Sequence, residues 1–102
     1  MDARLLLQLP DGTSEVVPLA PRTSIGRQPG NTVVLPDRQV SKEHALIERL
    51  PGGWFFRDLG SSNGSTVNGS RISSCWLHGG DEIVLGACRL RFQEGPPAGR
   101  RG

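Results

Sequence analysis

The chain has 102 residues, the size of one domain, and 35% of them are hydrophobic while 22% are charged. This balance indicates a globular domain and excludes an intrinsically disordered chain. The net charge of +2 is too small to indicate nucleic-acid binding unless the cations cluster. No apolar run approaches the ~20 residues of a membrane span, and the N-terminus lacks the basic region of a signal peptide. The two cysteines, Cys75 and Cys88, fit no zinc pattern, so we expect reduced thiols, no metal and a cytoplasmic location.

Short apolar runs separated by turn residues follow one another along the chain, and each run predicts a β-strand. The expected strands are residues 3–9, 15–19, 23–27, 32–35, 45–50, 54–59, 70–72, 75–77, 82–85 and 88–93. In the last of them Leu90 and Phe92 alternate with arginine and glutamine, which is the period of a half-buried strand. About ten short strands with frequent turns indicate an all-β sandwich.

Residues 37–50 form the only long segment without glycine or proline. Val40, Ile47 and Leu50 would share one face of a helix, so a helix is an open alternative here. Ala45 and Ile47 also fit one face of a strand, and nothing else in the chain has a helical pattern. We therefore favour a loop followed by a strand.

The stretch 58–69 (DLGSSNGSTVNG) is nearly devoid of apolar residues and contains two Asn-Gly pairs, Asn63-Gly64 and Asn68-Gly69. Asn-Gly suits a tight turn with positive φ at both central positions. Short hydroxyl side chains lie between the two pairs. The stretch is therefore either a pair of turns that presents polar groups to a ligand or an ordinary solvated loop.

A hydrolytic site could be drawn from Ser41, His44 and Asp58, but the sequence supports it poorly. The chain has no G-x-S-x-G motif, and a serine three residues before a histidine is commonplace. His44 directly precedes an apolar run, which indicates a buried structural histidine instead. We expect no catalytic residues, no enzyme activity and no nucleic-acid surface.

Three separate segments together offer the donors that a phosphate group requires. Arg27 supplies a guanidinium group and Lys42 an ammonium group, while Ser41 and Ser62 supply hydroxyls and Asn63 an amide. Arginine can hold two phosphate oxygens at once, and each hydroxyl adds one donor. If the loops at one end of the sandwich converge, this set suits a dianionic phosphate.

The motifs that carry these residues resemble those of the forkhead-associated (FHA) domain. They are SIGR at residues 24–27, VSKEHALI at 40–47, DLGSSNGSTVNG at 58–69 and HGGDEIVLG at 78–86. The resemblance spans about residues 5–93. It implies a SMAD/FHA-type β-sandwich of about eleven mostly antiparallel strands, with binding loops at one end and no helix at residues 37–50. The expected domain is residues 1–93, and residues 94–102 are expected to form a flexible tail or the start of a linker.

The resemblance also implies a function, which is to bind phosphothreonine in partner proteins during Ser/Thr-kinase signalling, as an adaptor without a cofactor. The partner would be a Thr-phosphorylated protein, either a kinase substrate or a kinase itself, and neither nucleic acid nor membrane. The alternative is a scaffold of the same fold that binds partners independently of phosphorylation.

The family pattern assigns a role to each matching position. The residues implied to bind the phosphopeptide are Arg27, Ser41, Lys42, Ser62 and Asn63. A loop that could set the flanking preference contains Arg38 and Gln39. Structural support is implied for Gly26, His44, Gly64, Asn68 and Gly69. We expect Ser61 and Thr66 to be bystanders. Serine stands at position 65, where threonine is commoner in the family, and we expect this difference to matter little because the hydroxyl is kept.

Overall fold

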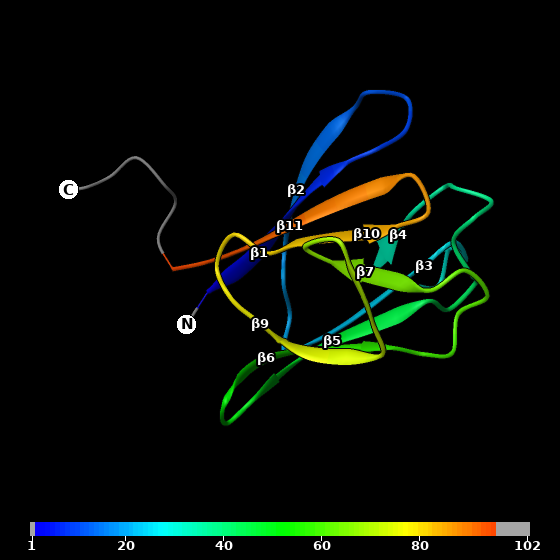
Figure 1. Ribbon diagram of the computed structural model, residues 1–102. Helices are drawn as coiled ribbons and strands as arrows, with labels where there is room; N and C mark the ends of the chain where they lie inside the picture. Colours follow the sequence, from blue (N-terminus) through cyan, green and yellow to red (C-terminus); the bar gives the residue numbers. More distant parts are fainter. Residues whose placement is uncertain (1, 96–102) are drawn as a thin grey trace.

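The computed structural model describes residues 2–95, which form eleven β-strands in two stacked sheets (Figure 1). The strands are β1 (Ala3–Gln8), β2 (Ser14–Pro18), β3 (Arg22–Gly26), β4 (Val33–Val34), β5 (Ala45–Leu50), β6 (Gly53–Asp58), β7 (Ser65–Val67), β8 (Ser70–Ile72), β9 (Ser74–Leu77), β10 (Glu82–Leu85) and β11 (Cys88–Glu94). Residues 2–95 contain no helix, so this part of the chain has no helix that could cross a membrane. The expected all-β class is confirmed, and the helical alternative for residues 37–50 is wrong.

One sheet has six strands in the order β2-β1-β11-β10-β7-β8, and the other has five in the order β4-β3-β5-β6-β9. All strand pairs are antiparallel except β3 with β4. The fold is therefore the mostly antiparallel sandwich of eleven strands that the resemblance implied.

The core lies between the sheets and follows the period-2 alternation of the strands. Leu90 and Phe92 of β11 are buried while the intervening arginines are exposed, and Trp54 and Phe56 of β6 are buried in the same way. Because each strand buries only alternate residues, a shift of one residue would expose this whole apolar set. The alternation thus fixes the register, and the register fixes where each loop leaves the sheet.

The strand that the sequence did not predict is β7. It contains Ser65 and Thr66, which we had assigned to a loop, and it pairs with β10 and β8. Of the two Asn-Gly pairs, the first does not form the turn with two positive φ angles that was one of the alternatives for this stretch. Gly64 has a φ of +82°, but Asn63 is absent from the positive-φ residues of the described chain. At the second turn Asn68 (+52°) and Gly69 (+86°) both have positive φ, as predicted for a two-residue hairpin turn.

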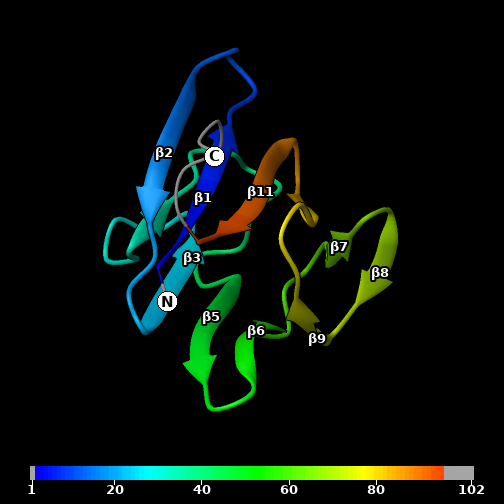
Figure 2. The ribbon, with the colours of Figure 1, turned by 90° about the vertical axis from the view of Figure 1, so that its left-hand side faces the viewer.

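The loops at residues 27–44 and 59–64 meet at one end of the sandwich, at the right-hand side of Figure 1. The start of β1 and the end of β11 lie at the opposite end, which faces the viewer in Figure 2. β11 extends one residue beyond the expected domain end, and residues 96–102 of the expected tail lie outside the described residues. The converging loops contain the positions that the sequence marked as phosphate donors.

Candidate functional site

Arg27 lies directly after β3 and is held against the next loop by two hydrogen bonds. Its backbone N–H donates to the carbonyl oxygen of Ser41 over 3.0 Å, and its Nε donates to that of Val40, also over 3.0 Å. The side chain is exposed, and no carboxylate of residues 2–95 lies within 4 Å of it. The guanidinium group is thus anchored through Nε, while its two terminal nitrogens stay available to a ligand.

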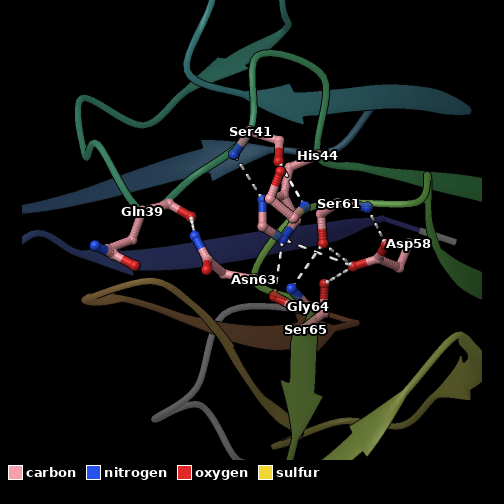
Figure 3. Close-up of polar contacts among 9 residues, drawn as sticks. Gln39, Ser41, His44, Asp58, Ser61, Asn63, Gly64 and Ser65 are labelled. Atoms are coloured by element: carbon pink, nitrogen blue, oxygen red, sulfur yellow. Dashed lines mark hydrogen bonds and ion pairs between the residues drawn. The ribbon is translucent and has the colours of Figure 1, made fainter.

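Ser41, Ser62 and Asn63 are brought together by contacts between their two loops. Figure 3 shows Ser41 near Asn63 and the bond from Asn63 to Gln39. The backbone N–H of Ser62 donates to Oγ of Ser41 over 3.0 Å, and Nδ2 of Asn63 donates to the carbonyl oxygen of Gln39 over 2.8 Å. Hydrogen bonds between these loops therefore bring together four of the five expected ligand residues, which are Arg27, Ser41, Ser62 and Asn63.

Lys42 is the fifth, and its backbone is fixed while its side chain is exposed. Its carbonyl oxygen accepts from the backbone N–H of Gln28 (3.2 Å) and from Nδ2 of Asn31 (2.7 Å). The sequence analysis did not single out Asn31, which ties the loop after β3 to the loop before β5. Gly26 completes this junction, because a Cβ at residue 26 would lie 2.2 Å from the carbonyl oxygen of Lys42.

His44 is completely buried beneath these loops, and both of its ring nitrogens bind the backbone. Nδ1 accepts from the backbone N–H of Ser41 over 3.0 Å, which places the ring proton on Nε2. Nε2 then donates to the carbonyl oxygen of Gly64, also over 3.0 Å. The imidazole therefore connects the two ligand loops. A Ser41-His44-Asp58 hydrolase is contradicted, because neither ring nitrogen is free to accept a serine proton.

Asp58 lies beside Ser61 and Ser65 and binds both of them, as Figure 3 shows. Its Oδ1 accepts from the backbone N–H of Ser61 (2.7 Å), and its Oδ2 accepts from the hydroxyls of Ser61 (2.7 Å) and Ser65 (2.5 Å). Burial raises the pKa of this carboxyl group, but the hydrogen bonds from Ser65 and Ser61, together with His44, more than offset it, so the pKa is lowered. Oδ2 lies 3.7 Å from Nε2 of His44.

Ser61 is therefore not the bystander that the sequence suggested, and Ser65 uses the hydroxyl that serine shares with threonine. Oγ of Ser61 both donates to Asp58 and accepts from the backbone N–H of Gly64 over 2.9 Å. Ser65 is buried and donates to the same carboxylate. These contacts fix the turn that carries Ser62 and Asn63.

Asp37 is a further residue that the sequence analysis missed. Its Oδ1 accepts from the backbone N–H of Gln39 (2.9 Å), and its Oδ2 from that of Ala87 in the β10–β11 turn (2.7 Å). These two bonds, from Gln39 first and then from Ala87, lower the pKa of Asp37. The loop with Arg38 and Gln39 is thereby attached to the other sheet, and Gln39 in turn binds Asn63.

Asn68 and Gly69 lie in the β7–β8 turn, apart from the contacts described above. Asn68 donates through Nδ2 to Asp81 (2.9 Å) and accepts at Oδ1 from the backbone N–H of Glu82 (3.0 Å). This side chain therefore fixes its own turn to the start of β10, and its contacts do not reach the 58–64 loop. Among residues 2–95, no group of three or more potential metal ligands gathers anywhere.

Comparison with known proteins agrees with this geometry. The family model described as FHA domain matches residues 23–86. The chain is 41% identical over 88 residues to the ABC transporter ATP-binding/permease protein Rv1747 of Mycobacterium tuberculosis, covering 86% of this chain and 10% of that one. It is 43% identical over 83 residues to the glycogen accumulation regulator GarA of Mycolicibacterium smegmatis, covering 80% and 52% respectively. It thus spans about a tenth of the first relative and about half of the second.

A solved structure from a study of phosphothreonine-dependent FHA domain interactions superposes with a TM-score of 0.81 at 33% identity. The alignment covers 92% of this chain and 99% of that one. Fold, motif order and sequence similarity agree over the same residues. The chain belongs to the FHA domain family.

Proposed function

We propose that this domain binds phosphothreonine-containing segments of partner proteins through the loops at residues 27–44 and 59–64. The observation that carries the proposal is the convergence of Arg27, Ser41, Ser62 and Asn63, joined by hydrogen bonds between loops far apart in the sequence. The terminal nitrogens of Arg27 would pair with two phosphate oxygens, and Lys42 would add positive charge. The hydroxyls of Ser41 and Ser62 would each contribute a donor.

The relatives support the same class of function. The similar solved structure concerns phosphothreonine-dependent interactions, and GarA is named as a regulator. We therefore propose a non-enzymatic adaptor that recognises Thr-phosphorylated proteins in Ser/Thr-kinase signalling inside the cell. The proposed binding unit is residues 1–93, and the activity and partners of any longer protein that contains it are part of the proposal.

The test is calorimetric titration with a phosphothreonine peptide, its phosphoserine analogue and its unphosphorylated form. Arg27→Ala removes charge-assisted hydrogen bonds worth about 1.5–3 kcal/mol each, so affinity for the phosphothreonine peptide should fall at least about tenfold. Arg89→Ala is the matched control, because Arg89 is an exposed arginine on β11 in the other sheet, and it should bind like the parent. Equal affinity of the parent for phosphorylated and unphosphorylated peptides would refute the proposal.

A further inference from the structure

A hollow of about 410 Å³ lies beside the proposed phosphate site, on the outer face of β3 and β5. Its lining residues are Arg22, Ser24, Gln28, Gly30, Asn31, Glu43, Leu46 and Leu59. Two of them directly follow proposed phosphate ligands in the chain, since Gln28 follows Arg27 and Glu43 follows Lys42. The hollow therefore directly adjoins two of the residues proposed to bind the phosphate.

The floor of the hollow is apolar and fixed in position. Leu46 is almost fully buried, whereas Leu59 is 44% exposed and is one of only four large exposed hydrophobic residues in the described chain. The backbone N–H of Leu59 donates to the carbonyl oxygen of His44 over 2.9 Å, so the same histidine that joins the ligand loops also holds this leucine. An exposed leucine held next to a binding site offers a surface for the aliphatic part of a ligand.

The lining of the hollow contains one cation, Arg22, and one carboxylate, Glu43, and among the described residues only Arg22 has an ion-pair partner. Arg22 is 3.1 Å from Glu48, which also lies 3.8 Å from Arg57. Glu43 is exposed, and within residues 2–95 no cation lies within 4 Å of it. A carboxylate next to a phosphate site opposes the phosphate itself, so phosphate binding does not explain its presence. It is complementary to a positive charge elsewhere in the ligand.

We propose that this hollow receives a long basic side chain, arginine or lysine, of the phosphopeptide itself. The methylene stem would lie on Leu59 and Leu46, and the charged end would meet Glu43. Glu43 and Leu59 are then specificity residues of a subsite, and this inference rests on the proposed phosphothreonine binding.

The experiment is fluorescence anisotropy with alanine-based phosphothreonine peptides that carry one arginine at each position from −4 to +4. At one position, arginine should strengthen binding at least about threefold over alanine, and glutamate there should weaken it. Glu43→Lys should reverse this preference, and Leu59→Ser should reduce the gain from arginine. Glu15→Lys is the matched control, because it reverses an exposed charge on β2, and it should leave the preference unchanged.

The outcomes separate this inference from the proposed function. If the all-alanine phosphothreonine peptide does not bind better than its unphosphorylated form, the proposed function fails. If it does bind better but no position favours arginine, or the preference survives in Glu43→Lys, the subsite is refuted. Thermal melting checks that each variant is folded, and Leu59→Ser should stay folded because Leu59 is 44% exposed and does not belong to the hydrophobic core.

Discussion

The replacement Asp58→Asn tests whether the proposed site depends on the carboxylate beneath the 58–64 loop. The side chain is 10% exposed and accepts three hydrogen bonds, one at Oδ1 and two at Oδ2. An asparagine has nearly the same shape, but its amide nitrogen cannot accept. With the amide nitrogen at the Oδ1 position, the backbone N–H of Ser61 would face another donor. With the amide nitrogen at the Oδ2 position, the hydroxyls of Ser61 and Ser65 would have to turn their protons away and lose their bonds to a charged acceptor.

The magnitude follows from these contacts. A hydrogen bond to a charged group contributes about 1.5–3 kcal/mol, and an unpaired buried donor costs about 1–3 kcal/mol. We expect Asp58→Asn to lower the free energy of unfolding by about 2 kcal/mol, which for a domain of this size lowers Tm by roughly 8–16 °C. Phosphopeptide affinity should also fall at least about threefold, because Ser61 holds the turn that presents Ser62 and Asn63.

The assays are urea denaturation monitored by tryptophan fluorescence and peptide titration of the folded variant. The matched control is Asp11→Asn, because Asp11 also accepts from a backbone N–H and a hydroxyl, both of Thr13, but in an exposed turn. Asp11→Asn should change the free energy of unfolding by no more than about 0.5 kcal/mol and leave peptide affinity unaltered. If the two variants unfold and bind alike, the supporting role of Asp58 is refuted.

Three further predictions concern glycine geometry and pH. Gly26→Ala should lower the free energy of unfolding by about 1–3 kcal/mol, because the new Cβ would lie 2.2 Å from a backbone carbonyl oxygen. Gly30→Ala is the control in the same denaturation assay and should be nearly neutral, because its Cβ would meet no atom within 4 Å. Gly64→Ala and Gly69→Ala should each cost about 1–2 kcal/mol because both residues have positive φ, but only Gly64→Ala should weaken peptide binding, and equal binding of both would contradict this. The pKa of Asp58 is lowered in the folded state. Its contribution to the free energy of unfolding is therefore fully present above the ordinary pKa of 3.8 and is lost as the pH falls through the folded-state pKa. Tm measured below about pH 4 should therefore fall more steeply for the parent than for Asp58→Asn.

The strands that the sequence predicted well are those whose own residues carry the pattern. The bounds of β5, β8 and β10 agree with expectation, because apolar alternation or flanking turns mark them. β7 has no such pattern, because it is three residues long and lies within the polar stretch 58–69, and its pairing with β10 and β8 identifies it as a strand. Asn63 likewise lacks the predicted positive φ, in a loop where its amide binds Gln39 across 24 residues. In both places the structure depends on contacts with residues distant in the sequence, which local patterns do not reveal.

The candidate site divides in the same way. Residues proposed to contact the ligand could be named from the sequence, because a guanidinium group or a hydroxyl is informative wherever the loops place it. The residues that position them could not. Asp37 acts through a bond to Ala87, 50 residues away, and Asp58 acts through three hydroxyl and amide donors. An aspartate in a loop sequence does not indicate such a supporting role, because its hydrogen-bond donors are known only once the chain is folded.

These supporting bonds bear on how the site would bind. Ser41, His44 and Gly64 are connected through one imidazole, and Gln39 binds Asn63, so the two ligand loops are ordered relative to each other before any ligand arrives. A ligand that finds its donors already in place loses less of its binding free energy to ordering them. The remaining mobile parts would be the exposed ends of the Arg27 and Lys42 side chains. Breaking one loop contact should therefore weaken binding even when both charged side chains are intact. The Asp58→Asn titration measures this effect directly, because it disturbs the loop and leaves Arg27 and Lys42 unchanged.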